Sequence, residues 1–245
     1  MSFFRSLAVS AAAFVVTGAS LSYGVTITGD QTYIRSDNQS GNYGGDVTII
    51  LGTTTSPATI RGLLSFSLAS IPAGSQITDI SLVLKNRNPD GTTGGPFTVD
   101  LHQLTKAFAE GTGTAGAPNT TVGASWTRTG VGGVNWTTPG GDFGAVLSSF
   151  SASTGGAGGL TYTFGTSSAF VQAAQAALNG GQDLSLLMKL SDESTATRKI
   201  FFLESDNSDT AGGPVPQLIV NYIPEPSSML LSSVAALGLL RRRRR

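Results

Sequence analysis

The chain has 245 residues, of which 32 are glycine and one is histidine, and it has no cysteine. The absence of cysteine excludes disulfide scaffolds, cysteine-bound zinc and thiol nucleophiles. The formal net charge is zero, but residues 25–223 hold nine Lys or Arg against fourteen Asp or Glu, a charge of −5, and five arginines stand together at 241–245. A weakly acidic body argues against nucleic acid as a partner.

Residues 1–24 have the order of a secretory signal peptide. Arg5 supplies a positive charge, an apolar run follows at 7–16, and small residues lead to Gly24. This order of charged, apolar and small residues is typical of a segment removed after export. We therefore predict a signal peptide over 1–24, cut after Ser20 or Gly24.

Residues 25–223 contain many short stretches that alternate between apolar and polar residues, which is the period of half-buried strands. The predicted strands are 47–51, 59–68, 77–84, 97–101, 160–164, 184–190, 200–203 and 218–222. Turn clusters rich in Gly and Pro, such as 72–74 and 139–141, separate them. This pattern predicts an all-β fold in the form of an antiparallel sandwich.

One segment has helical periodicity instead. Within 167–178, Phe170, Ala174 and Leu178 fall on one face of a helix. Ser167 can cap its start, and the glycines at 180–181 can end it. We predict one short helix that lies across the sandwich.

Three aromatic residues are candidates for contact with carbohydrate: Trp126, Trp136 and Tyr43. An aromatic face covers the C–H surface of a sugar ring while neighbouring polar groups bind its hydroxyls. The alternative is that these rings fill the core or cover a loop. The only histidine, His102, continues the alternation of 97–101 and is predicted on the exposed polar face. No Gly-x-Ser-x-Gly motif accompanies it, so nothing indicates a catalytic triad.

Acidic and amide side chains gather in two predicted loops. The first holds Asp37, Asn42 and Asp46, and the second holds Asp206 and Asp209. Carboxylate and amide oxygens are the ligands that Ca²⁺ prefers. Neither loop has the spacing of an EF-hand, so a structural calcium ion and solvated turn residues remain the two interpretations. No other cofactor is predicted.

Residues 224–245 have three parts. Pro224, Glu225 and Pro226 come first, an uncharged apolar stretch follows at 227–240, and an arginine cluster that begins with Arg241, Arg242 and Arg243 stands last. Fourteen helical residues span about 21 Å, which makes a short transmembrane helix against a ~30 Å hydrocarbon core. The arginines favour the cytoplasmic side of the membrane.

These three parts resemble the PEP-CTERM sorting signal. The resemblance implies that an exosortase processes the tail near Pro224 to Pro226, after the apolar helix has tethered the chain transiently to the inner membrane. It also implies that the body reaches the cell envelope, the surface or the extracellular matrix of a Gram-negative bacterium. We therefore predict a sorting signal over 224–245.

Several motifs follow one another through residues 25–223. They are 30–35 with 42–44, 61–66 with 70–74, Trp126 and Trp136 with 137–143, 170–181, and Glu204 ahead of 216–222. In this order they resemble DNRLRE-domain proteins, a jelly-roll group related to carbohydrate-binding modules. The sequence departs from the family at Ser67, where an acidic residue is expected. The resemblance implies a jelly-roll β-sandwich over 25–223, and jelly-roll modules of this kind often carry a structural calcium ion.

Three functions remain open at this stage. Our prediction is a non-catalytic surface or matrix protein that binds, or is embedded in, exopolysaccharide. A secreted polysaccharide lyase or hydrolase is the first alternative, for which the chain offers carboxylates but no recognisable pair. A structural adhesin that associates with copies of itself is the second.

Overall fold

The computed structural model describes residues 21–55, 58–87, 92–114, 122–153, 159–195, 197–203 and 216–225. The predicted signal peptide therefore lies outside the described residues except for its last four positions. The predicted apolar helix and arginine cluster of the tail lie wholly outside them.

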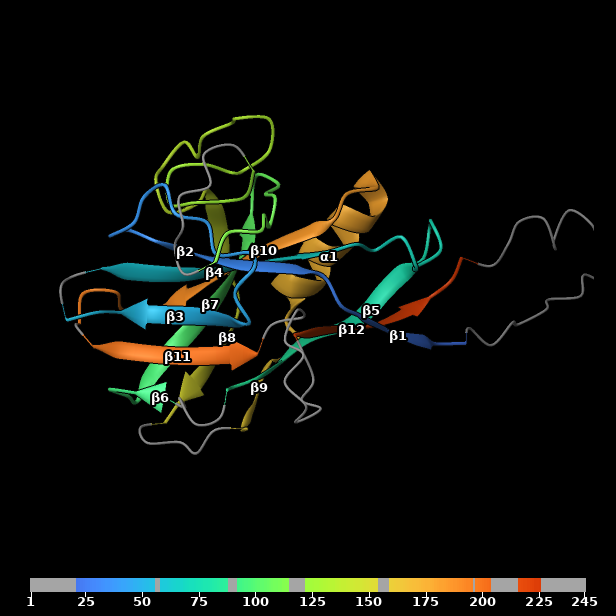
Figure 1. Ribbon diagram of the computed structural model, residues 1–245. Helices are drawn as coiled ribbons and strands as arrows, with labels where there is room; N and C mark the ends of the chain where they lie inside the picture. Colours follow the sequence, from blue (N-terminus) through green and yellow to red (C-terminus); the bar gives the residue numbers. More distant parts are fainter. Residues whose placement is uncertain are drawn as a thin grey trace, which may run out of the picture.

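The described body is built mostly of strands, with a single helix among its described residues (Figure 1). In chain order the elements are β1 (Tyr23–Ile27), β2 (Asp30–Arg35), β3 (Thr48–Thr53), β4 (Thr59–Phe66), β5 (Gln76–Lys85), β6 (Thr92–Thr93), β7 (Phe97–Leu104), β8 (Phe143–Ala152), β9 (Thr161–Phe164), α1 (Ser168–Gly180), β10 (Leu184–Leu190), β11 (Arg198–Leu203) and β12 (Gln217–Ile223). Every strand and the helix predicted from the sequence are present. The prediction misses β1, β2, β6 and β8.

The strands form two antiparallel sheets. The smaller sheet has the order β1-β12-β5-β9, and the larger has the order β6-β11-β3-β4-β10-β7-β8, with β2 also paired to β4. This arrangement confirms the all-β antiparallel class. The jelly-roll connectivity stays a prediction.

The space between the two sheets is filled by a cluster that we call the inner core. From the larger sheet it takes alternate residues of β4, namely Ile60, Leu64 and Phe66, and from the smaller sheet it takes residues such as Leu82 and Val220. Each of these side chains is at most 1% exposed. Full burial of one such side chain stabilises the fold by about 1.5–3 kcal/mol.

The opposite face of the larger sheet carries a second cluster, which we call the outer cluster. Its buried members are Ile34, Leu63, Leu104, Phe108, Ala124, Trp126, Trp136 and Leu187. Half of them come from the sheet and half from residues 105–114 and 122–142, which we call the covering loop. Figure 1 shows this loop in green to yellow over β2, β4 and β10. The larger sheet is therefore buried on both faces over this area.

Helix α1 begins and ends as its sequence predicts. The Ser167 hydroxyl accepts a hydrogen bond from the Phe170 N–H at 3.0 Å, and Gly181 adopts a left-handed conformation at φ 60° after the last turn. The helix packs against β5, β8 and β10. Its buried face closes one end of the inner core.

The two ends of the body lie side by side because β1 pairs with β12. Tyr23 is opposite Tyr222, and their rings stack with centroids 6.0 Å apart. Cleavage of the signal peptide after Ser20 would leave β1 whole. Cleavage after Gly24 would remove the first two residues of that strand.

Candidate functional site

The two tryptophans proposed for sugar contact belong to the outer cluster. Trp126 is 9% exposed and Trp136 is 4% exposed. The indole N–H of Trp136 donates to the Ser125 carbonyl at 2.9 Å. In this arrangement neither ring offers a free face to a sugar. Both instead attach the covering loop to the sheet.

Arg61 of β4 lies against the ring of Trp126 and against that of Phe143. Its guanidinium donates two hydrogen bonds to the Glu193 carboxylate, at 2.9 and 2.7 Å, and a third to the Gly140 carbonyl at 2.8 Å. It also stands 5.0 Å from the Trp126 ring centroid, a cation–π distance. Since the two-pronged contact occupies both carboxylate oxygens, Glu193 acts as a structural anchor.

Tyr43, the third aromatic candidate, is also buried, at 4% exposure. It stacks on Tyr33 with ring centroids 4.3 Å apart, and its hydroxyl accepts a hydrogen bond from Asn38 at 3.2 Å. The Tyr33 hydroxyl donates to Asp46 at 2.6 Å. Burial, and then this hydrogen bond, raise the pKa of Tyr33. The loop after β2 is thus held by contacts among its own residues and with Tyr33 of β2.

The carboxylates proposed as calcium ligands already have partners in the protein. Asp37 accepts two hydrogen bonds from Arg35, at 2.9 and 2.7 Å, which lower the pKa of Asp37. Asp46 accepts the bond from Tyr33. Both carboxylates are thus engaged within the protein, and among the described residues no group of three His, Cys, Asp or Glu is placed to hold a metal ion. The calcium site stays a prediction. Asp206 and Asp209 lie outside the described residues.

Asn42, counted among the possible calcium ligands, is instead a fully buried connector. Its amide nitrogen donates to the carbonyls of Glu110 and Ala124 at 2.6 and 2.9 Å. Its amide oxygen accepts from the N–H groups of Gly113 and Gly44 at 2.8 and 3.3 Å. The side chain therefore joins the loop after β2 to both parts of the covering loop.

His102 is not exposed, contrary to the prediction. It is 7% exposed, its Nδ1 lies 2.8 Å from the Gly144 carbonyl, and its ring lies 4.8 Å from that of Phe143. Because a carbonyl only accepts hydrogen bonds, Nδ1 carries the proton. The alternation along β7 holds as far as Leu101, and the register shifts between Leu101 and His102. The face of the strand that the prediction assigned to solvent is also covered.

The predicted sorting motif begins where the last strand ends. Strand β12 lies between β1 and β5, with Tyr222 opposite Ile77 and Ile223 opposite Gln76. Pro224 follows at once. No unpaired linker separates the sheet from the motif.

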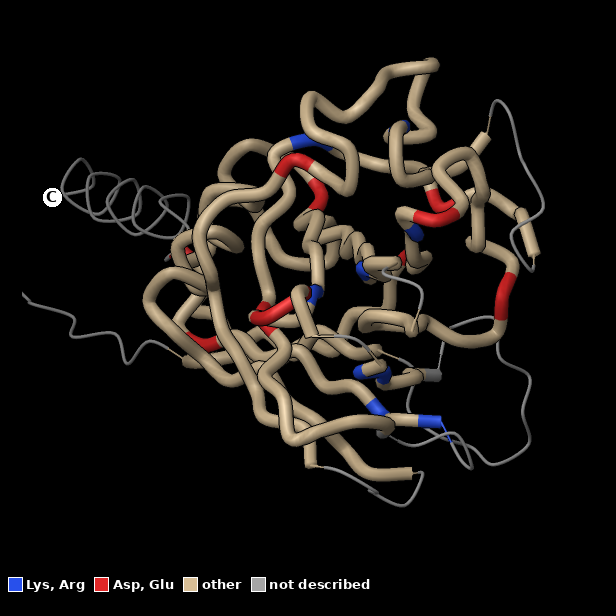
Figure 2. Tube along the Cα trace, turned by 90° about the vertical axis from the view of Figure 1, so that its left-hand side faces the viewer, with Lys and Arg blue, Asp and Glu red and all other residues tan. Residues whose placement is uncertain are grey.

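Glu225 of this motif lies directly against the turn between β4 and β5. Gly74 in that turn has φ +80°, and a Cβ placed on it would stand 2.8 Å from the Glu225 carboxyl carbon. The turn, the start of β5 and one side of α1 enclose a groove of about 400 Å³ that Glu225 helps to line. In Figure 2 the end of the body from which the chain continues to the tail carries acidic residues (red) but no basic ones (blue).

Gln175 of α1 holds this turn in place. Its side-chain oxygen accepts the Ile77 N–H at 2.7 Å, and its nitrogen donates to the Ser75 carbonyl at 3.0 Å and to Asn179 at 2.9 Å. The Ser75 N–H also donates to the Pro72 carbonyl at 3.1 Å. The surface under Glu225 is therefore fixed by hydrogen bonds from two directions.

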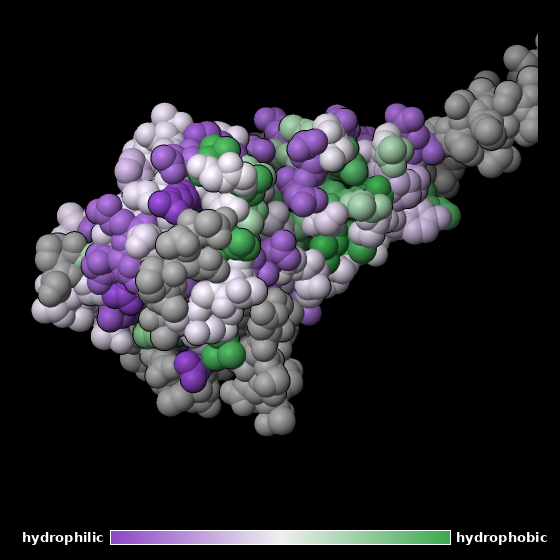
Figure 3. Space-filling view, turned by 45° about the horizontal axis from the view of Figure 1, so that its top comes forward, coloured by the Kyte–Doolittle hydropathy of each residue, from purple (hydrophilic) through white to green (hydrophobic). Residues whose placement is uncertain are grey.

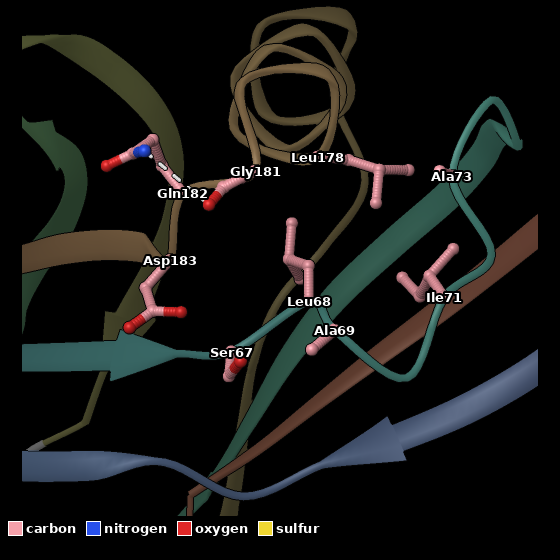
Figure 4. A pocket seen from close by; sticks show the side chains of 9 residues that line it. All are labelled: Ser67, Leu68, Ala69, Ile71, Ala73, Leu178, Gly181, Gln182 and Asp183. Carbon is pink, nitrogen blue, oxygen red and sulfur yellow. Dashed lines mark hydrogen bonds between the residues drawn. The ribbon is translucent and has the colours of Figure 1, made fainter.

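A second hollow of about 270 Å³ lies on the other side of the same turn (Figure 4). Leu68, Ile71 and Leu178 point toward one another across it, while Gln182 and Asp183 stand at its polar edge. Figure 3 shows hydrophobic surface (green) gathered on the right-hand half of the body in that view. The hollow is smaller than the usual range for small-molecule sites.

Comparison with protein families decides the nature of the tail. Residues 223–245 match the PEP-CTERM protein-sorting motif. The tail is a PEP-CTERM sorting signal. The chain is thus an exported protein that an exosortase recognises, with a location in the cell envelope or at the surface.

The match stops at the body, so the resemblance to DNRLRE-domain proteins stays a prediction. No curated protein matches the chain. Among the described residues no helix is long and apolar enough to cross a bilayer, and the apolar stretch at 227–240 lies beyond them.

Sequence reasoning found the PEP-CTERM signal but missed its contact with the body. The turn at 72–74 was predicted. The only sequence signal for the contact was the glycine of this turn, because glycine suits a position with positive φ. That this turn would lie under Glu225 depends on β5 pairing with β12, which are more than 130 residues apart along the chain. No local pattern reports such a neighbour.

Proposed function

We propose that an exosortase cuts this protein in its tail, and that the body then serves as a non-catalytic component of the surface or extracellular matrix, in contact with exopolysaccharide. The observation that carries the proposal is the PEP-CTERM match, which begins at residue 223, the last residue of β12. Cleavage beyond this strand leaves the two-sheet body whole. The proposal includes a Gram-negative host and a transient tether in its inner membrane.

Contact with polysaccharide would use hydroxyl and amide groups. The body is weakly acidic and rich in Ser, Thr and Gly, which suits hydrogen bonding to a neutral polymer. The three aromatic candidates are buried, so loops and the exposed strand faces would supply the contacts. Side chains of this kind on β8 include Ser149 and Ser151, which are both exposed.

The processing step is tested with the full chain in an exosortase-carrying Gram-negative bacterium. The wild type is compared with a variant in which Pro224, Glu225 and Pro226 are all alanine. We expect the wild type to lose its tail, seen as a smaller mass, and to reach the surface or medium, while the variant keeps its tail and stays with the membrane. Equal processing of both chains, or of neither, contradicts the proposal.

The polysaccharide contact is tested with the processed body recovered from that culture. It is sedimented with the exopolysaccharide of the producing organism, with and without Ca²⁺, and the polymer length is measured afterwards. Co-sedimentation with an unchanged polymer supports a binding component. A shortened polymer identifies an enzyme, and assembly without polymer identifies a self-associating adhesin.

A further inference from the structure

The backbone ahead of the motif is paired on both sides as far as Tyr222, and what we infer from this rests on the proposed processing. An enzyme that binds an extended peptide pairs with free N–H and C=O groups of that peptide. In β12 the residues up to Tyr222 are paired with β1 on one side and with β5 on the other. Ile223, directly upstream of Pro224, is paired with Gln76 of β5 but has no partner in β1, so it is the one residue at this end of β12 with a side left unpaired. An enzyme that binds the chain on both sides of the motif therefore meets the surface of the body itself.

The surface beside the motif offers a carboxylate and amide groups to a partner. Glu225 is exposed and sits over Gly74 at the edge of the groove, with its carboxylate free to accept a basic donor. Exposed amides of Gln76 and Gln172 line the same groove. None of the residues that line it is Lys or Arg, so a basic group from a partner meets no like charge there.

We propose that the processing enzyme recognises Glu225 as part of a folded surface, made by the β4–β5 turn and α1, and not as a free linear peptide. The partner segment that fits has a basic side chain for the glutamate and hydrogen-bonding groups for the neighbouring amides. The folded body thereby contributes to the recognition of the tail by the processing enzyme. Gly74 is a positioning residue, since any side chain there would displace Glu225.

Insertion of a linker distinguishes recognition of a folded surface from recognition of a linear motif. Five Gly and Ser residues are inserted between Ile223 and Pro224 of the full chain, and the rate of tail loss is followed in the exosortase-carrying host. We expect tail loss about tenfold slower, equivalent to about 1.4 kcal/mol of recognition energy. The same insertion between Gly132 and Gly133, where a Cβ placed on either glycine would meet nothing within 4 Å, is the control and leaves the rate unchanged.

An unchanged or faster rate with the linker after Ile223 overturns the inference, because the motif would then act alone or be hindered by the body. Failure of the wild type to lose its tail would instead overturn the proposed function. The two failures are therefore distinguishable.

A pair of matched substitutions tests the glycine. Gly74→Ala and Gly132→Ala both place a side chain at positive φ, +80° and +57°, but only the first meets Glu225. We expect Gly74→Ala alone to slow tail loss, with an unfolding midpoint close to that of Gly132→Ala. Equal rates for the two variants contradict a positioning role. If Gly74→Ala does not fold, the linker variant still decides.

Discussion

The two faces of the larger sheet are both covered by hydrophobic side chains, but by different means. The inner core lies between the two sheets, and most of its members come from strands that alternate with period two, with α1 supplying others. The outer cluster meets the covering loop, whose described residues include no long strand. One face is closed by regular structure and the other by a loop.

Because of this difference, the outer cluster depends on polar contacts more than the inner core does. Asn42 ties the covering loop to the rest of the body with three hydrogen bonds, and Arg61 does so with one. Asp142 joins the two parts of the covering loop to each other, through Lys106 on one side and Thr137 and Thr138 on the other.

Some backbone groups of the covering loop bond to one another, as the Trp136 N–H does to the Thr127 carbonyl at 3.1 Å. Others, such as the Ala124 carbonyl and the Gly113 N–H, depend on a side chain for their partner. We therefore expect apolar truncation to be most costly inside, and polar truncation to be most costly outside.

The largest loss of stability is expected from Phe66→Ala. Phe66 is fully buried in the inner core, and removal of such a ring costs about 4 kcal/mol. Urea unfolding of the processed body measures the change in the free energy of unfolding. Val146→Ala on β8, at a position 44% exposed, is the control and should change it by less than about 0.5 kcal/mol. A loss for Phe66→Ala below that of any polar variant described next would break the comparison.

Asn42→Ala tests the outer face and should cost about 3 kcal/mol, because four backbone groups, three of them in buried hydrogen bonds, lose their partner. We expect proteases to cut the covering loop before the body unfolds globally. Asn42→Asp keeps the acceptor oxygen but replaces the amide donor that faces the carbonyls of Glu110 and Ala124, so it should be nearly as damaging. A covering loop that stays resistant to proteases in both variants would show that Asn42 does not hold it.

The same contrast explains what the sequence could predict. Alternation along 59–68 placed Leu64 and Phe66 inward and Arg61 outward, as the structure has them. It could not show that the outward side is covered, and for that reason His102 was assigned to solvent. Periodicity reports which residues share a face of a strand, but not what lies over that face.

The tryptophans and the polar residues Asn42 and Asp46 were predicted to bind sugar or calcium for a related reason. Tryptophans in a glycine-rich loop are typical both of sugar sites and of loop anchors, and composition does not separate the two. Asn42 and Asp46 have calcium-ligand chemistry, but their partners lie elsewhere in the fold. The PEP-CTERM signal was found because its three parts are adjacent in sequence, whereas its contact with Gly74 was not.

Arg61→Lys asks whether the two-pronged contact matters beyond charge. Lysine keeps the positive charge but cannot bind both Glu193 oxygens and the Gly140 carbonyl together, nor stack as well on Trp126. Since the pair is only partly buried, we expect a loss of about 2 kcal/mol. A cycle that combines Arg61→Lys with Glu193→Gln isolates the coupling between them. A lysine variant as stable as the wild type would assign the outer face to hydrophobic contact alone.

The smallest effect is expected from Asp142→Asn, and it depends on pH. Burial opposes ionisation of Asp142, but hydrogen bonds from Lys106 and from the N–H groups of Thr137 and Thr138 outweigh it and lower its pKa. A carboxyl with a lowered pKa stabilises the fold above its unfolded value of about 3.9, and this stabilisation is lost as the pH falls through the folded value. Asp142→Asn should therefore cost about 1 kcal/mol at pH 7, and the difference from wild type should shrink below about pH 4.

Asp192 provides the matched control for this titration. Hydrogen bonds from Ser194 and Thr195 lower its pKa as well, but it is exposed and lies outside the covering loop. Protease resistance of the covering loop is measured for both asparagine variants from pH 7 downward. If Asp142→Asn alone loosens the loop at pH 7, the charge at Asp142 holds the outer face. Equal behaviour of the two variants would mean that the loop is held by its hydrophobic anchors and by Asn42, and that the polar ties at residues 137–142 follow from that packing.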